Sequence, residues 1–127
     1  MRPRIGWQID AGVNGQALGN NMLAHLDDWQ RREGRIAAST LWRPACSFMA
    51  DTAEVLLGFV ERQVPGVMHV DSNAHEAHTF DRIVAALKQE FDREAWVIEP
   101  HEKYRHDQRL IGWVAMLGLS GRLAALR

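Results

Sequence analysis

The sequence predicts an α/β fold, in which short strands and helices alternate and some of the strands pair in parallel. From Arg4 onward, strand-like and helix-like segments follow the order β-α-β-α-β-α-β-α, with short connections. The clearest helical segment repeats its apolar residues with the 3.6-residue period of a helix packed on a core. The chain has 127 residues, enough for one domain that buries roughly two-thirds of its unfolded surface. We therefore expect residues 1–127 to form a single domain.

The first expected strand lies at Arg4–Ile9, almost at the start of the chain. A loop rich in Gly and Asn follows over Gly12–Gly19. Most domains have a lead-in before their first core strand. Because this strand starts so close to Met1, we expect a truncated chain.

The first expected helix begins after the Gly-rich loop and ends before Gly34. Asn20 or Asn21 can cap it, because an Asn side chain accepts a hydrogen bond from a free N–H of the first turn. Asp27 and Arg31 have the spacing of an ion pair on the wet face. Gly34 suits the left-handed conformation that ends many helices. The apolar face comprises Met22, Leu26 and Trp29.

A strand, a helix and another strand are expected in the middle of the chain. The strand lies over Arg35–Leu41. Asp51 and Glu54 then have the spacing of a capping box, a pair of reciprocal hydrogen bonds that begins a helix. This helix is expected to end before the turn signal Pro65–Gly66, and a short strand follows at Val67–Val70.

The clearest helix and a polar-to-apolar tail make up the rest of the chain. Thr79 is the expected N-cap of the helix. A short strand is expected at Trp96–Ile98 and is stopped by Pro100. One or two short helices are expected near Leu110–Met116 and Ser120–Leu126. The apolar repeat of the clear helix comprises Phe80, Ile83, Val84, Leu87 and Phe91.

The composition argues against several classes of partner. Lys plus Arg is 15 and Asp plus Glu is 16, so the net charge is −1, and we expect neither nucleic acid nor an anionic membrane as a partner. No apolar run reaches the length of a membrane span, and no apolar signal region follows Met1. Cys46 is the only cysteine, which rules out a disulfide within the chain and argues against a cysteine-based zinc site. These features favour a reducing, cytoplasmic location.

Two motifs approach known catalytic or cofactor-binding patterns and then depart from them. The segment His75–His78 (His-Glu-Ala-His) is one residue short of the His-Glu-x-x-His spacing of zinc proteases, so we expect solvated loop histidines and no metal. The loop Gly12–Gly19 lacks the three-glycine pattern that brings backbone amides to a pyrophosphate. It can still line a ligand cleft, because ligands in such folds bind beyond the carboxyl ends of the strands. No Gly-x-Ser-x-Gly motif supports a nucleophilic serine, and we expect no catalytic residue.

Trp42 and Arg43, just before Pro44, form the local pair that invites a binding role. Core packing explains Trp29 and Trp96, because these two lie at periodic or strand positions. Trp42 instead lies in a connection, and Arg43 can pair bidentately with a phosphate group. An ordinary surface role for Arg43 remains the open alternative.

Six stretches, covering nearly all of the chain in order and spacing, carry a family resemblance. Together they resemble the C-terminal part of dTDP-4-dehydrorhamnose reductase-like proteins, which are extended short-chain dehydrogenase/reductases that act on sugar nucleotides. The segment Ser39–Ala45 departs from the Asp-Gln-x-Gly-x-Pro-Thr pattern of that family and keeps only the Pro. The stretches are Arg4–Trp7, Gly19–Leu23, Phe48–Glu54, Pro65–Val70, Thr79–Phe80 and Tyr104–Leu110.

The resemblance implies the substrate-binding portion of an extended Rossmann-type reductase, without the dinucleotide-binding half. The NADPH loop and the Ser/Thr-Tyr-Lys catalytic group of the family would lie upstream of Met1. Tyr104 is the only tyrosine, and the position four residues on is Gln108, so the Tyr-x-x-x-Lys pair is missing. The complete family enzyme would reduce a keto-sugar with NADPH. This chain is expected to bind no cofactor alone and to leave hydride transfer to that complete enzyme.

The substrate-side positions that the resemblance implies are Asn20, Asn21, Arg43 and Arg105. The first hypothesis is therefore a sugar-nucleotide-binding domain or fragment, in which arginines hold the diphosphate and loop amides hold the sugar. It is paired with a missing N-terminal half. The alternative is a non-catalytic regulatory or protein-interaction subunit, because short strands with open edges invite pairing with another chain. In that case the apolar tail Gly112–Leu119 is the expected interface of a homo-oligomer or mixed assembly.

Overall fold

The computed structural model describes residues 2–10, 21–111 and 114–127, and every structural statement concerns these residues. Helices and strands are mixed along them, but the strict alternation expected from the sequence is wrong: two strands precede α1, three lie between α1 and α2, and two follow α3. In chain order the elements are β1 (Arg2–Ile5), β2 (Trp7–Ile9), α1 (Met22–Glu33), β3 (Ile36–Ser39), β4 (Trp42–Arg43), β5 (Cys46–Phe48), α2 (Met49–Glu61), β6 (Val67–Val70), α3 (Phe80–Glu90), β7 (Ile98–His101), β8 (His106–Asp107) and the 3-10 turns η2 (Leu119–Gly121) and η3 (Ala124–Leu126).

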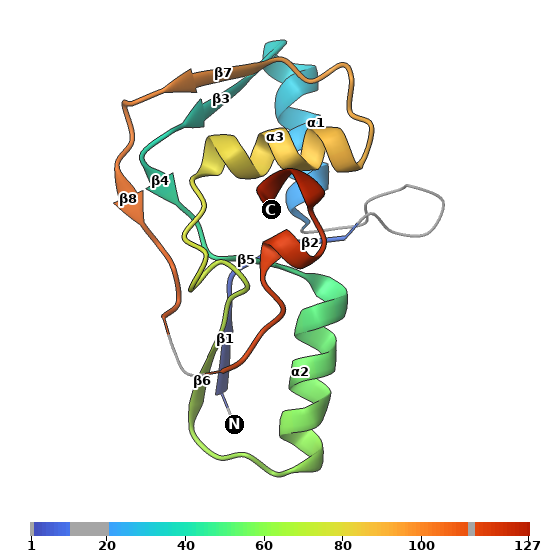
Figure 1. The fold of residues 1–127 in the computed structure, drawn as a ribbon, viewed down its shortest axis with the longest axis vertical. Coiled ribbons are helices and arrows are strands. Elements are labelled where there is room, and N and C mark those ends of the chain that lie inside the picture. Colours follow the sequence, from blue (N-terminus) through green and yellow to red (C-terminus); the bar gives the residue numbers. More distant parts are fainter. Residues whose placement is uncertain (1, 11–20, 112–113) are drawn as a thin grey trace.

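The elements form two lobes (Figure 1). The major lobe contains α1, α3, β3, β7 and the C-terminal turns, and the minor lobe contains β1, β6 and α2. The β2–β5 pair lies where the lobes meet, and the tail residues 114–117 run between β6 and α2. Each lobe therefore packs its helices against its own pair of strands.

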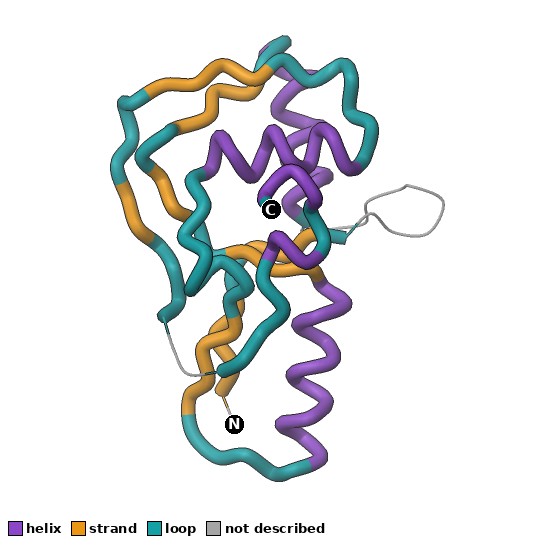
Figure 2. The backbone as a smooth tube through the Cα atoms, viewed as in Figure 1, coloured by secondary structure: helices purple, strands orange, loops and turns teal. Residues whose placement is uncertain are grey.

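All the strands pair in parallel, each with one partner, in the described part of the chain. β1 pairs with β6, β2 with β5, β3 with β7 and β4 with β8. Figure 2 shows the β3–β7 and β4–β8 pairs following one another along one side of the major lobe. The parallel pairing confirms the expected α/β class.

Gly6 allows the chain to change partners between β1 and β2. A Cβ atom at Gly6 would collide with the backbone of Ala45, so only glycine fits this close approach. Beside it, the Trp7 N–H donates to the Ala45 carbonyl at 2.8 Å. The single strand expected at Arg4–Ile9 is therefore two strands, joined at the glycine.

The ends of α1 confirm the expected caps. The Asn21 Oδ1 atom accepts a hydrogen bond from the Leu23 N–H at 3.0 Å. Gly34 ends the helix with φ of 73°, and its N–H donates to the Gln30 carbonyl at 2.8 Å. The helix buries Met22 and Leu26 in the major lobe.

The expected ion pair between Asp27 and Arg31 is wrong. Arg31 bonds to Asp28 instead, one residue nearer along the helix. Asp27 accepts hydrogen bonds from the Arg93 guanidinium at 3.1 Å and the Trp96 indole at 2.9 Å. Asp27 therefore joins α1 to the segment after α3, a long-range contact that local spacing cannot reveal.

The expected capping box of α2 is also wrong. The helix begins at Met49, directly after β5, with Phe48 at the N-cap position and no side-chain cap. Asp51 therefore lies inside the first turn, where it accepts two hydrogen bonds from the Arg122 guanidinium, both at 2.7 Å. The helix continues to Glu61, and its expected end before the Pro65–Gly66 turn is confirmed.

α3 buries its apolar repeat as expected. Phe80, Ile83, Val84 and Leu87 are buried, and Phe91 packs on the same cluster from its edge. Thr79 occupies the N-cap position, although its hydroxyl donates to the Asp81 carboxylate at 2.6 Å and caps no helical N–H.

The strand β7 lies further along the chain than the expected Trp96–Ile98. The strand covers Ile98–His101 and includes Pro100, which lies opposite Ala38. The Ile36 N–H donates to the Val97 carbonyl at 2.8 Å, so the backbone N–H and C=O groups of every second residue from Val97 point toward β3. Pro100 falls on the other side, where its missing N–H leaves the strand pair intact.

The C-terminal tail contains no α-helix in its described residues. Residues 110–111 and 114–116 are irregular, which corrects the helix expected near Leu110–Met116. The helix expected at Ser120–Leu126 is a pair of 3-10 turns, η2 and η3. The described tail residues are held by contacts with both lobes and not by regular helical hydrogen bonds.

Two separate apolar clusters hold the lobes. The larger cluster joins α1, α3, β3 and the C-terminal turns. The smaller one joins α2, β6 and the tail, around buried Phe59, Met68 and Val70. The buried members of the larger cluster are Ile9, Met22, Leu23, Leu26, Ile36, Ala38, Cys46, Phe48, Phe80, Ile83, Val84, Ala86, Leu87, Trp96, Leu119, Leu123 and Leu126.

Candidate functional site

The strand pair β4–β8 brings together Trp42, Arg43, Tyr104, Arg105 and Gln108, a group that we call the Trp42 shelf. Trp42 lies opposite His106 and Arg43 opposite Asp107, and the Gln108 N–H donates to the Arg43 carbonyl at 2.8 Å. Arg105 directly precedes β8. The pairing therefore places two of the expected binding residues, Arg43 and Arg105, on the same small ribbon.

Ser39 positions the segment that carries Tyr104 and Arg105. Its hydroxyl donates to the Tyr104 carbonyl and accepts a hydrogen bond from the Leu41 N–H at 3.1 Å. The Thr40 N–H donates to the His101 carbonyl at 2.9 Å. These bonds hold segment 102–105, between β7 and β8, against the end of β3.

The Trp42 indole is held by packing and by one hydrogen bond. Its ring centre lies 4.5 Å from that of Phe80 and 5.5 Å from that of Tyr104, which meets it edge-on. Its Nε1–H donates to the Gln108 Oε1 atom at 2.7 Å. The indole is only half-buried, so part of it remains available to a ligand.

Trp42 borders two hollows. The larger one has a volume of about 440 Å³ and lies by the carboxyl end of β1, between Trp7, Pro44 and Gln108. The smaller one, of about 170 Å³, lies between Trp29, His101 and Tyr104. Position beyond the end of a parallel strand is where α/β folds commonly bind ligands.

The shelf carries more positive than negative charge. Hydrogen bonds from the Arg109 guanidinium, with a smaller contribution from the charge of Arg43, lower the pKa of Asp107 to about 2. Arg109 holds this carboxylate with two bonds of 2.8 Å. Arg43 and Arg105 are exposed, and no ion pair to either is seen among the described residues. An anion is therefore the favoured ligand.

Asn21 has a structural role in α1. Besides its cap to Leu23, its side chain accepts from the Asp10 N–H at 3.2 Å and donates to the Asp10 carbonyl. It is fully buried. Asn20 and the loop Gly12–Gly19 lie outside the described residues, so contact of a ligand with this region stays a prediction.

The histidine motif anchors the tail. The Glu76 carboxylate accepts hydrogen bonds from the Ser120 N–H at 2.9 Å and from the Ser120 hydroxyl. His78 Nε2 lies 3.1 Å from the same carboxylate. Because Glu76 stands between Ser120 and His78, the imidazole cannot take the serine proton, and this group is not a nucleophilic triad. No cluster of three or more His, Cys, Asp or Glu that could hold a metal is found in the parts of the chain the structure describes.

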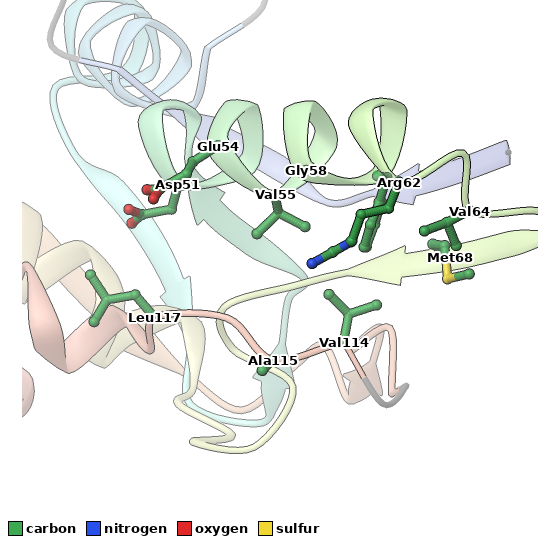
Figure 3. A pocket seen from close by; sticks show the side chains of 11 residues that line it. Asp51, Glu54, Val55, Gly58, Arg62, Val64, Met68, Val114, Ala115 and Leu117 are labelled. Carbon is green, nitrogen blue, oxygen red and sulfur yellow. The ribbon is translucent and has the colours of Figure 1, made fainter.

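A larger cavity lies in the minor lobe, under α2. Its volume is about 680 Å³. Figure 3 shows its lining side chains converging from α2, β6 and the tail. Asp51 and Glu54 stand at one end of the helix face and Arg62 toward the other. We call it the α2 cavity.

Sequence reasoning missed several of these features. Gln108 entered it only as the residue that replaces a lysine, and β8 was not expected. The α2 cavity had no sequence signal, although Asp51, Val55, Gly58 and Arg62 share a helix face at i, i+4, i+7 and i+11.

Comparison of the chain with protein-family models, with curated proteins and with solved structures finds no match. None of the helices described is long and apolar enough to cross a bilayer.

Proposed function

We propose that this chain binds a sugar nucleotide on the Trp42 shelf and performs no redox step alone. The observation that supports the proposal is a half-exposed indole beside a hollow, on the same strand pair that carries the exposed Arg43 and leads in through Arg105. In this role the chain resembles the substrate-binding portion of an NADPH-dependent keto-sugar reductase. Its only tyrosine, Tyr104, has no lysine four residues on to assist proton transfer.

The chemistry of the shelf matches the parts of a nucleoside diphosphate sugar. A base or sugar ring can stack on Trp42, and a base–aromatic stack contributes about 1–3 kcal/mol. Arg43 and Arg105 supply guanidinium groups suited to bidentate bonds with the diphosphate. The side-chain oxygen of Gln108 accepts a hydrogen bond from the Trp42 indole N–H, and this bond keeps the ring in place for stacking.

Calorimetry with UDP and dTDP tests this function. We expect binding that weakens about tenfold in Arg43→Gln and again in Arg105→Gln, because each removes a charge-assisted contact of about 1.5 kcal/mol. Arg35→Gln is the control, since Arg35 is an exposed arginine that pairs with Glu99 at the neighbouring β3–β7 strand pair. Uridine, which lacks phosphate, should bind equally to all these proteins.

The proposal fails if neither nucleotide gives heat or a thermal shift at millimolar concentration. It also fails if Arg35→Gln weakens binding as much as Arg43→Gln does, since that result would indicate a general charge effect.

A second candidate is a protein-interaction subunit, favoured by apolar side chains exposed on the minor lobe. Leu57 is 58% exposed and Val60 62% exposed, on the face of α2 turned away from the α2 cavity. Of the expected interface Gly112–Leu119, Leu117 is half exposed while Leu119 is buried. Gly112 and Trp113 lie outside the described residues.

Side chains, and not the backbone of β1, would have to make such an interface. The Arg2 N–H donates to the Gly66 carbonyl at 2.7 Å. The backbone polar groups of Arg2 and Arg4 therefore point toward β6, and the backbones of Pro3 and Ile5 form the outer edge of β1. Pro3 has no N–H to offer at this outer edge, and a proline there discourages pairing with another strand.

A further inference from the structure

The α2 cavity has the size and the walls of a small-molecule site. Its volume of about 680 Å³ lies within the ~300–1,000 Å³ of typical ligand pockets. Most of its walls are apolar, and the strip of α2 that faces it has Gly58 at its centre, where the missing side chain leaves room. The apolar lining comprises Val55, Phe59, Val64, Met68, Val114 and Leu117.

Arg62 gives this apolar cavity one available positive charge. Its guanidinium folds back along α2 over Gly58 and points into the cavity (Figure 3). The guanidinium lies over the Phe59 ring, with 5.9 Å from the guanidinium carbon to the ring centre. No hydrogen bond or ion pair to the Arg62 side chain is present among the residues that the structure places. Its donors are therefore available to an anionic group in the cavity.

The protein itself neutralises Asp51, one of the two carboxylates at the acidic end of the cavity. Asp51 accepts two hydrogen bonds of 2.7 Å from Arg122, whose guanidinium also lies over the Phe48 ring at 5.5 Å. Glu54 also acts on Arg122, and its charge helps to raise the pKa of that guanidinium. The Arg62 guanidinium lies over Gly58, about 6 Å along the helix axis from Glu54. Val64 and Met68 lie at the end of the cavity away from the two carboxylates (Figure 3).

We propose that the α2 cavity binds a small amphiphile with an apolar body and a carboxylate head, of the chemical class of a medium-chain fatty acid. The head pairs with Arg62, and the body lies against Phe59, Met68 and Val114. A nucleoside diphosphate does not suit this cavity, because its walls offer one free guanidinium and few polar groups. The site is therefore separate from the Trp42 shelf, and the inference goes beyond the proposed function.

Three probes of equal chain length test the chemistry: decanoate, decan-1-ol and decyltrimethylammonium. Titration calorimetry of the purified chain should give tightest binding for decanoate, weaker binding for decan-1-ol and the weakest for the cation. Arg62→Gln should weaken decanoate binding about tenfold and leave decan-1-ol binding unchanged, because only the charged contact is lost. Arg82→Gln, an exposed arginine on α3 in the other lobe, is the matched control and should change neither.

A second pair of variants tests the location. A Cβ at Gly58 meets only the end of the Arg62 side chain, at 3.5 Å, so Gly58→Ala should keep the fold and most of the binding. Gly58→Leu should fill the cavity and abolish binding of decanoate and decan-1-ol alike. Circular dichroism should show the same helix content in both variants.

Several results would overturn the inference. Equal affinity for decanoate and decan-1-ol, or full decanoate binding by Arg62→Gln, would remove the role of the charge. Full binding by the folded Gly58→Leu variant would place the ligand elsewhere, and no binding of any probe would remove the site. Self-association that covers the cavity and excludes decanoate would assign this face to a second copy instead. Binding of UDP by Arg62→Gln, unchanged from the original chain, separates these failures from a failure of the Trp42 shelf.

Discussion

Asp71 is the buried carboxylate on which three segments meet. Its oxygens accept hydrogen bonds from the backbone N–H groups of Cys46 at 3.0 Å, Asn73 at 2.9 Å and Leu110 at 2.9 Å. Burial raises the pKa of Asp71, and the three hydrogen bonds with the charge of Arg109 only partly oppose that rise. A single side chain therefore joins β5, the turn after β6 and the tail.

Replacing Asp71 by Ala should destabilise the chain by about 2–4 kcal/mol, because it strands three backbone donors at once. Asp71→Asn should cost less, since the amide oxygen can keep two of them. Urea denaturation measures both. Asp28→Ala is the control: Asp28 binds Arg31 and Arg32 on the surface, where solvent screening leaves such pairs little effect on stability. Equal losses in Asp71→Ala and Asp28→Ala would contradict this role.

The 3-10 turns η2 and η3 bury Leu119, Leu123 and Leu126 in the large apolar cluster and are also held by the bond between Glu76 and Ser120. Burial alone would raise the pKa of the Glu76 carboxyl, but the hydrogen bonds from Ser120 and His78 outweigh it, and the pKa lies below its ordinary value. Arg127 adds a bond from its side chain to the Ser120 carbonyl at 2.9 Å. An ionised carboxylate therefore holds the start of the tail turns, beside their buried leucines.

Acid should release these turns before the rest of the chain unfolds. A carboxyl whose folded pKa is depressed stabilises the folded state above its unfolded pKa, about 4.3 for Glu, and this contribution is lost as the pH falls through the lower folded value. The protection of the Ser120 amide against hydrogen exchange, measured relative to an unstructured amide at the same pH, should therefore fall below about pH 4. In Glu76→Gln the exchange should already be fast at neutral pH and depend less on acid. A Ser120 amide that stays protected in that variant would rule out the Glu76 anchor.

At the scale of the whole molecule, association through α2 is the prediction to measure. If the protein-interaction function is correct, light scattering should report dimers or larger species that Leu57→Asp with Val60→Asp converts to monomers. Both side chains are exposed, so the double variant should keep its fold. Leu117→Asp, on the cavity side, is the comparison and should leave the α2 outer face intact. A monomer at every concentration tested would remove this candidate.

Local signals predicted the parts of the fold that depend on neighbouring residues. Asn21 and Gly34 mark the ends of α1 because capping and the left-handed conformation involve residues only a few positions apart. The periodic repeat from Phe80 to Phe91 predicted α3 for the same reason. Binding of a ligand by Arg43 and Arg105 stays a prediction, although their place on one ribbon agrees with it.

Long-range contacts decided the parts that sequence reasoning could not predict. β4 and β8 have two residues each, too few for any periodic pattern, and exist because they pair with each other. Asp27 accepts hydrogen bonds from residues beyond α3, and Asp51 accepts them from Arg122 near the end of the tail. The α2 cavity depends on a tail without regular secondary structure, whose course no local propensity specifies.

Pro3 bears on how the protein behaves in concentrated solution. Fibrils grow when identical strands add to one another along an uninterrupted row of backbone donors and acceptors. On the outer side of β1 that row is broken at an imino acid, while the other side is already occupied by β6. A cross-β filament therefore has no continuous row of backbone hydrogen-bonding groups to grow from at β1, even though apolar side chains lie beside this strand.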